Sequence, residues 1–249
     1  NLYVEPNSND AGTATGAALL YHYRLIEQEK DADRSYVYVP RKRNDNLFLG
    51  PEYNYSIEDI RRKTKKYDVE IIEYSYNDIA ELIKDGNIVS IFQGRSENGP
   101  RALGNRSILF NPTIENGKDI VNRVKGREYF RPFAATVLKE YAHEWFDMRG
   151  MEESPHMMYA MYCSSDKYAE QIPAIIHIDK TCRIQTVKEH QNPIFYEMIQ
   201  KFYEQTGVPV LFNTSFNLGG EPLVETIDDA VRTLSESAIE YLYLPDNNL

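Results

Sequence analysis

The pattern of apolar and polar residues changes near residue 69. Before that point, small residues at 7–29 have the spacing of a helix, but charged runs interrupt the apolar positions that follow. From residue 69 onward, short apolar runs alternate with longer amphipathic stretches, and turn residues separate the two. Short apolar runs are typical of buried strands, and apolar residues three or four apart are typical of helices. The alternation predicts a mixed α/β (α+β) sheet domain over residues 69–249.

The expected elements follow from this pattern. Apolar runs predict strands at 37–39, 69–74, 88–92, 157–163, 174–178, 181–187 and 240–244, with a further strand beginning at 208. Amphipathic stretches predict helices at 56–66, 78–85, 115–125, 139–147, 193–206 and 227–234. Several of these helices begin after residues that are good N-caps: Ser56, Asn77, Asn192 and Thr226.

Residues 93–109, QGRSENGPRALGNRSIL, form a glycine-punctuated basic loop directly after an expected strand. Backbone N–H groups and cations in such loops are suited to surround an anionic ligand. From residue 93 to residue 131 the chain has eight Lys or Arg against four Asp or Glu, a net charge of +4. The whole chain has a net charge of −10, so the remainder carries −14. A local positive region in an acidic chain therefore predicts an anion-binding site.

Composition and charge argue against several classes of protein. With 249 residues, 42% of them hydrophobic, the chain is long enough for one large or two small globular domains. No apolar run reaches the roughly 18–20 residues that span a bilayer, so we expect no membrane association. The net charge of −10 argues against a general nucleic-acid binder. Cys163 and Cys182 form no Cys-x-x-Cys pair, which fits a reducing cytoplasm.

The basic loop is not a P-loop. Its first two glycines have the P-loop spacing, but Pro100 and Arg101 follow them instead of Lys and Ser or Thr. What remains is a set of arginines, whose planar guanidinium groups suit bidentate contacts with phosphate or carboxylate. Each such contact contributes about 1.5–3 kcal/mol. The alternative, which the sequence leaves open, is that Arg95 and Arg106 pair with local acids such as Glu97 at the surface.

Two further segments carry candidate ligand contacts. Residues 125–137, KGREYFRPFAATV, place Arg131 where the chain enters the core, whereas Arg123 and Arg127 are expected to be solvated. In residues 212–217, FNTSFN, polar side chains directly follow a strand, where ligand contacts converge in open α/β sheets. A turn or capping role for these polar residues is the alternative.

Other chemistries have little support in the sequence. Arg183 lies in an expected hairpin and is uninformative alone. The five histidines include no His-x-x-x-His pair, so no zinc site is expected, and no Gly-x-Ser-x-Gly is present. Asp10 is the one residue of the N-terminal polar loop that offers a metal ligand.

Taken together, these segments resemble the C-terminal half of the bacterial O-carbamoyltransferases that carbamoylate nodulation factors and antibiotics. The string Gly-Arg-x-Glu-x-Gly-Pro-Arg-Ala-Leu-Gly is long and specific. The matching motifs occur in the family's order along most of the chain: NDAGTATGAA (9–18), QGRSENGPRALGNRSIL (93–109), KGREYFRPFA (125–134), HIDKTCRIQTV (177–187) and FNTSFNLGGEP (212–222).

The resemblance implies three parts: the tail of an actin-like carbamoyl-transfer domain at 1–30, a connecting segment at 31–68, and a YrdC-like twisted sheet domain with helices at 69–249. The YrdC-like domain is expected to convert carbamoyl phosphate and ATP, with Mg²⁺, into a carbamoyl-adenylate. The actin-like domain is expected to pass the carbamoyl group to a hydroxyl-bearing acceptor, such as a sugar or an antibiotic, with the help of an iron-type metal. Such a biosynthetic transferase is expected in the cytoplasm.

The motifs also imply roles for particular residues. Catalytic contacts to the phosphates and the carbamoyl group are implied for Arg101, Arg131 and Arg183. Contacts to the nucleotide or the carbamoyl group are implied for Lys125, Arg106, Asn213 and Ser215. Asp10 matches the metal-ligating aspartate of the actin-like domain.

One departure from the family pattern matters. The His-x-x-x-His metal pair of the actin-like domain is missing and the first residue is Asn1, so we interpret the chain as a fragment that does not complete the transfer alone. Two other hypotheses stay open: a non-catalytic nucleotide-binding domain, and a double-stranded RNA-binding module, to which YrdC-like domains are related. The acidic balance outside the basic region argues against the second, and we expect no nucleic-acid partner.

Overall fold

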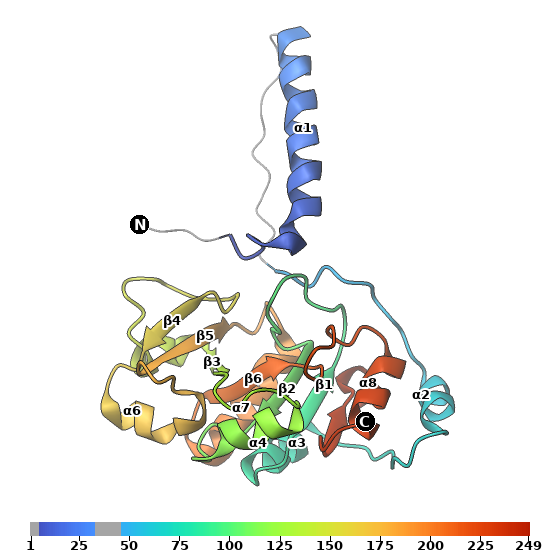
Figure 1. Ribbon diagram of the computed structural model, residues 1–249, viewed down its shortest axis with the longest axis vertical. Coiled ribbons are helices and arrows are strands. Elements are labelled where there is room, and N and C mark those ends of the chain that lie inside the picture. The colour runs from blue at the N-terminus through green and yellow to red at the C-terminus, as the bar shows by residue number, and fades with distance from the viewer. Residues whose placement is uncertain (1–4, 33–45) are drawn as a thin grey trace.

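The computed structural model describes residues 5–32 and 46–249 (Figure 1). Within these residues, no helix is long and apolar enough to cross a membrane. Helix α1, Thr13–Ala32, stands away from the rest of the described chain, which is built around a sheet (Figure 1). The strand expected at 37–39 lies outside the described residues.

A mixed sheet organises the described chain. Its strands are β1 (Val89–Phe92), β2 (Arg106–Phe110), β3 (Ala134–Leu138), β4 (Tyr159–Tyr162), β5 (Thr181–Val187), β6 (Val210–Ser215) and β7 (Tyr241–Tyr243), in the order β4-β5-β3-β6-β2-β1-β7. β3 is parallel to β5 and β1 to β7, and the other neighbours are antiparallel. Every residue of β1, β2 and β3 is buried, so both faces of the central sheet are covered. The predicted α/β sheet domain is confirmed.

Helices and short 3₁₀ turns connect and cover the strands. The remaining helices are α2 (Ile57–Thr64), α3 (Tyr76–Lys84), α4 (Gly117–Val124), α5 (Ala142–Trp145), α6 (Asp166–Gln171), α7 (Pro193–Thr206) and α8 (Ile227–Ser235). Helices α3 and α7 pack on each other, with α3 against β1 and β2 and α7 against β3 and β6. Aromatic side chains fill the core beside the sheet: the Phe212 ring lies 4.4 Å from that of Phe133 and 6.0 Å from that of Phe110.

Helix starts follow the capping chemistry of the sequence. Ser56 and Thr226 cap α2 and α8 as predicted, and each takes part in a reciprocal capping box. Helix α3 begins after Ser75, so the prediction that Asn77 caps it was wrong by two residues. Ser75 Oγ accepts from the backbone N of Asp78 at 3.3 Å, while the Asp78 carboxylate accepts from Ser75 N at 2.8 Å. The Ser-x-x-Asp pair satisfies two backbone donors, which a lone Asn does not.

The strand predicted at 69–74 is absent from the described fold. The segment passes beside the short edge strand β7 instead of joining it. Tyr74 N donates to the backbone O of Asn248 at 3.1 Å, and the Tyr74 ring meets that of Tyr241 edge-on at 6.4 Å between centroids. Its apolar residues therefore cover the sheet edge through side chains rather than through a hydrogen-bonded ladder.

The strand predicted at 174–178 is also wrong. Residues Pro173–Ile175 form a 3₁₀ turn, η3, which starts at a proline that has no N–H for a ladder. The backbone N of His177 then donates to the O of Thr181 at 2.8 Å and closes a tight turn into β5. Only the second half of the expected hairpin is a strand.

Residues 46–68 pack on the sheet domain. Leu47 and Ile60 are buried, and α2 contacts α8. The backbone N of Gly50 donates to Ser96 O at 3.0 Å, and Asn98 N donates to Leu47 O at 2.7 Å. This segment thus supports the loop between β1 and β2, whereas the boundaries predicted at residues 30 and 68 stay predictions.

The candidate segments of the sequence meet at one end of the sheet. β1 ends and β2 begins there, because Phe92 pairs with Arg106. β3 and β5 both begin there, with Ala134 opposite Arg183. β6 ends there, because its Asn213 also pairs with Ala134. The loops after β1, before β3 and after β6 therefore share one end of the sheet.

Gly104 lets the β1–β2 loop, residues 93–105, lie directly on α7. Its φ is +112°, and a Cβ added there would stand 2.2 Å from Cδ1 of Phe195, a fully buried residue in the first turn of α7. The position therefore needs glycine both for its backbone conformation and for the close approach.

We predict that Gly104→Ala lowers the free energy of unfolding by about 3 kcal/mol, because the clash with Phe195 adds to the cost of the left-handed backbone. Urea denaturation measures the loss. Gly150→Ala is the matched control, since Gly150 has a φ of +78° with open space around the added Cβ. The control is expected to lose about 1 kcal/mol, and equal losses in the two variants would show that the contact with Phe195 does not constrain the loop.

Candidate functional site

Arg183 lies near the start of β5. Its side chain is half-buried, and its Nε is buried without a hydrogen-bond partner among the described residues. Burial, together with the charges of Arg101 and Arg127, lowers the pKa of Arg183 to about 10. The guanidinium groups of Arg101 and Arg127 thus each lie close enough to that of Arg183 to repel it.

Arg101 reaches the same place from the β1–β2 loop. Its Nη1 donates to the adjacent carbonyl of Pro100 at 3.2 Å. Its Nε, like that of Arg183, is buried and finds no partner within the described parts of the chain. Burial lowers the pKa of Arg101, which means that a charged guanidinium at this end of the sheet destabilises the fold.

Arg127 is the third member of this group. Its Nε donates to Asn122 Oδ1 at 2.6 Å, its Nη2 donates to Pro132 O at 3.2 Å, and its guanidinium lies 4.1 Å from the centre of the Phe133 ring. Burial, followed by the charge of Arg131, lowers its pKa to about 10. The prediction that Arg127 is solvated was wrong. The feature of the sequence that could have indicated this burial is Gly126, which has a left-handed φ of +62° and turns the chain from α4 back toward the sheet.

We call Arg101, Arg127 and Arg183 the arginine cluster. Among the ion pairs of residues 5–32 and 46–249, none joins a member of the cluster to a carboxylate. Like charges at one place repel, and partial burial strengthens the repulsion because the local dielectric is low. Guanidinium groups in this arrangement are suited to bind an anion that carries more than one negative charge.

Lys125 lies beside the cluster, but its amine is used inside the protein. The residue is 2% exposed, and its Nζ donates to the backbone O of Ser215 and to the O and Oδ1 of Asn217, the last two at 2.8 and 3.0 Å. These contacts use the three donors of an ammonium group. Burial, followed by the charge of Arg127, lowers the pKa of Lys125 to about 7. Lys125 therefore fixes the loop after β6 and adds charge next to the cluster, and its predicted contact with a ligand stays a prediction.

Ser215 and Asn217 form the loop that Lys125 holds. Ser215 Oγ donates to Asn217 Oδ1 at 2.6 Å, and Asn217 Nδ2 donates to the backbone O of Glu221 at 2.6 Å. The sequence includes Asn217 in the polar motif but assigns it no role. The position of Asn217, two residues after the end of β6, could have indicated this structural role, because an Asn side chain at such a position folds back onto the chain. The nucleotide contact predicted for Ser215 is untested by these bonds.

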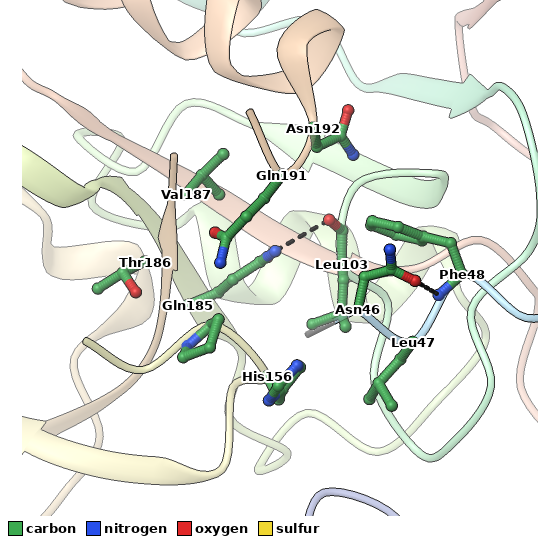
Figure 2. Close-up of a pocket in the computed structure, with 11 residues that line it drawn as sticks. Asn46, Leu47, Phe48, Leu103, His156, Gln185, Thr186, Val187, Gln191 and Asn192 are labelled. Carbon is green, nitrogen blue, oxygen red and sulfur yellow. Dashed lines mark hydrogen bonds between the residues drawn. The ribbon is translucent and has the colours of Figure 1, made fainter. Parts of the chain in front are cut away.

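Asn213 lies beneath the β1–β2 loop. It is 1% exposed, and its Nδ2 donates to Thr136 Oγ1 at 2.8 Å and to the backbone O of Ala102 at 3.3 Å. Gln185 Nε2 donates to Leu103 O at 2.9 Å, the bond dashed in Figure 2. These amides tie the backbone next to Arg101 to the sheet. The predicted contact of Asn213 with the adenylate stays a prediction.

Arg106 is fully buried and hydrogen-bonds to the backbone of the β1–β2 loop. Its Nη1 donates to Asn105 O at 3.0 Å, its Nη2 donates to Gly94 O at 3.1 Å, and its guanidinium stacks 3.6 Å from the centre of the Phe92 ring. Glu97 Oε1 accepts from backbone N–H groups of the same loop. The alternative that Arg106 forms a surface ion pair is wrong, and its predicted secondary contact with a ligand stays a prediction.

Arg131 is exposed at the rim of the site. Its Nε lies 2.7 Å from Oε2 of Glu128, and both side chains are 52% exposed. Its charge lowers the pKa of Arg127. Arg131 is thus paired with Glu128 at the rim, whereas the charge of Arg101 acts on Arg183, and the catalytic role predicted for Arg131 stays a prediction.

Asp10 lies in a 3₁₀ turn, η1 (Asp10–Gly12), ahead of α1. Its backbone O accepts from Thr13 Oγ1 at 2.7 Å. In the described part of the chain, no three His, Cys, Asp or Glu side chains come together to hold a metal ion. Asp10 therefore stays a predicted ligand without described co-ligands.

A small cavity lies beside Leu103 of the β1–β2 loop (Figure 2). Leu47, Leu103, Gln185 and Asn192 are among the residues that line it, and none of the arginine cluster does. Its volume of about 20 Å³ has room for about one water molecule. This cavity is too small for a substrate.

Comparison with known proteins agrees with the motifs. Over 248 residues the chain is 37% identical to nodulation protein NolNO of Sinorhizobium fredii, covering 97% of this chain and 35% of that protein. It is 30% identical over 250 residues to the 3'-hydroxymethylcephem-O-carbamoyltransferase of Streptomyces clavuligerus, covering 99% of this chain and 43% of that enzyme. The chain thus spans about two fifths of the length of such curated relatives.

Solved structures match more distantly. HypF from T. kodakarensis superposes with a TM-score of 0.49 and 18% identity, covering 69% of this chain and 21% of that one. A Sua5 variant from P. abyssi superposes with a TM-score of 0.45 and 16% identity, covering 72% of this chain and 50% of that one.

The family model described as the carbamoyltransferase C-terminus matches residues 80–249, which hold the whole sheet and the arginine cluster. The chain therefore belongs to the carbamoyltransferase C-terminal family.

Proposed function

We propose that this chain supplies the part of an O-carbamoyltransferase that binds carbamoyl phosphate and ATP and joins them into a carbamoyl-adenylate. The observation that carries the proposal is the arginine cluster: Arg101 and Arg183 each keep a buried Nε without a described partner, and no member of the cluster forms an ion pair with a described carboxylate. Family membership gives the reaction class, and the whole protein's transfer to a sugar or antibiotic hydroxyl is part of the proposal.

The charges of both substrates suit the cluster. Carbamoyl phosphate and the triphosphate of ATP are polyanions, and each charge-assisted bond to a guanidinium contributes about 1.5–3 kcal/mol. Buried Nε atoms of Arg101 and Arg183 are available for such bonds. The positions of these groups are fixed by the sheet and by the amide network under the loop, so they stabilise developing charge without rearranging.

The atom balance of the reaction sets what the site must do. Carbamoyl-adenylate, phosphate and pyrophosphate together contain one oxygen more than the two substrates, so one water is consumed. Water releases phosphate from carbamoyl phosphate and leaves carbamate. A carbamate oxygen then bonds to the α-phosphorus of ATP, the bond from that phosphorus to the β-phosphate oxygen breaks, and pyrophosphate leaves with the electron pair. Negative charge builds up on phosphate oxygens in both steps, where the guanidinium groups act.

Arg131 fits this scheme as a residue that changes partner. Its pair with Glu128 is half-exposed, and such pairs contribute about 0–1 kcal/mol. A phosphate in the cluster offers a stronger partner, so exchanging Glu128 for phosphate is favourable. This step would bring Arg131 into the contact that the family resemblance implies.

The two metals of the proposal differ in their fit. Mg²⁺ neutralises triphosphate charge when bound and is commonly held through substrate phosphates, so we assign it to the nucleotide and to no residue of the chain. An iron-type metal needs several protein ligands, and the described residues bring no such set to Asp10.

Arg183→Ala tests the site directly. We predict that it weakens the binding of ATP and of carbamoyl phosphate by about 10- to 100-fold, because a partly desolvated charge-assisted contact is lost. Isothermal titration calorimetry measures the binding, and a coupled assay measures pyrophosphate release. Arg123→Ala, at an exposed arginine of α4, is the control and is expected to bind as the unchanged chain does. Equal affinities for all three proteins would overturn the assignment of the site.

The pH dependence of anion binding tests the contribution of Lys125. Since the pKa of Lys125 is lowered to about 7, its charge is present at pH 6 and mostly lost at pH 9. An anion favours the charged form, so we predict that sulfate affinity falls by about tenfold over this range. Sulfate does not titrate in this range, and Lys125→Met is expected to flatten the profile while Lys125→Arg keeps the affinity high at pH 9. A fall of the same size in folded Lys125→Met, checked by circular dichroism, would assign the titration to another group.

Two assays separate the proposal from the other hypotheses. Pyrophosphate release that requires both ATP and carbamoyl phosphate supports the enzyme, whereas ATP binding without release supports a non-catalytic nucleotide-binding domain. Filter binding to tRNA at two salt concentrations tests the RNA-binding hypothesis, which requires strong and salt-sensitive binding.

A further inference from the structure

Two aromatic side chains stand exposed beside the arginine cluster. Tyr129 and Phe130 are 76% and 66% exposed. They lie in the loop between Arg127 and Arg131: Tyr129 is two residues after Arg127, and Phe130 directly precedes Arg131. Large apolar side chains that the fold leaves in water next to a charged site indicate a ligand or partner surface.

The backbone of this loop is held in place. Asn122, itself 1% exposed, donates from Nδ2 to the backbone O of Tyr129 and to that of Arg131, each at 3.1 Å. The Oδ1 of the same side chain accepts from Arg127 Nε. One buried amide therefore fixes the backbone of Tyr129 relative to an arginine of the cluster.

The two rings are also arranged relative to each other. Their centroids are 6.0 Å apart and their planes meet at 81°, an edge-to-face pair that leaves ring faces open. Base stacking on open aromatic faces is favourable and tolerates any base, since every base has a π-face.

We propose that Tyr129 and Phe130 bind the base of a nucleotide whose phosphates lie on the arginine cluster. This inference rests on the proposed function and adds to it a subsite for the base. The arrangement suits a nucleotide, because a nucleotide joins a polyanion for the guanidinium groups to a flat ring for the exposed aromatic side chains. Carbamoyl phosphate has no ring, so its binding is expected to involve neither Tyr129 nor Phe130.

A comparison of ATP with tripolyphosphate isolates the base. Tripolyphosphate has the same chain of phosphates and no ring, so the ratio of the two affinities reports stacking. We expect the unchanged chain to prefer ATP by about fivefold or more. Tyr129→Ala and Phe130→Ala should each reduce this preference, while their tripolyphosphate affinity stays unchanged.

The controls separate stacking from general effects. Phe130→Tyr keeps an aromatic face and should keep the preference for ATP, and Tyr21→Ala removes a tyrosine of α1 that is 66% exposed and should change nothing. Because the substituted side chains are exposed, thermal unfolding should be unaltered. Calorimetry at fixed ionic strength measures all affinities.

Each result has a distinct meaning. If neither ATP nor tripolyphosphate binds, the proposed function fails together with this inference. If both bind with equal affinity to the unchanged chain, the arginine site stands and the base subsite is overturned. If the preference for ATP survives in both alanine variants, the base lies elsewhere and the inference is also overturned. Loss of the preference in the alanine variants alone supports it.

Discussion

Repulsion among guanidinium groups at one end of the sheet is the constraint on which the site depends. Arg101, Arg127 and Arg183 would separate in a flexible chain, because exposed like charges gain by moving apart. The fold prevents this by attaching them to different rigid supports. Arg183 projects from a strand, Arg127 is hydrogen-bonded to Asn122, and Arg101 lies in a loop that Asn213 ties to the sheet. The free energy of core packing therefore maintains a concentration of charge that only an anion relieves.

The residues that hold the loops around the cluster are themselves polar and buried, and this explains the rigidity of the site. Glu97, 7% exposed, accepts backbone N–H groups of the β1–β2 loop, and Arg106 donates to carbonyls of that loop. Lys125 does the same for the loop after β6. Buried polar groups are costly unless satisfied, and satisfied networks specify one conformation. The charged residues that shape the loops are thus different from those that face a ligand.

Local patterns predicted most of the sheet and several caps, but not contacts between distant segments. The runs at 88–92 and 181–187 became strands because their apolar content matches burial within the sheet, and the capping boxes at Ser56 and Thr226 need only neighbouring residues. The run at 69–74 has the same local pattern, yet it covers an edge of the sheet through Tyr74 instead of pairing. Whether a segment pairs as a strand depends on whether a neighbouring strand edge is available to it, and the periodicity of the segment carries no information about that edge.

The arginines show the same limit within the site. Nothing in the immediate sequence separates Arg106 from Arg183. Both have a buried Nε without a described partner, but Arg106 also donates from Nη1 and Nη2 to backbone carbonyls. The difference arises from register: Arg106 starts β2 opposite Phe92, which offers its ring face, while Arg183 lies opposite Ala134, which offers no polar group. Arg106 is held inside the loop by its bonds to backbone carbonyls and its contact with Phe92. Arg101 and Arg183 are only partly buried and keep a buried Nε that an anion can satisfy, so within the positive region they are the arginines best placed to act on a ligand.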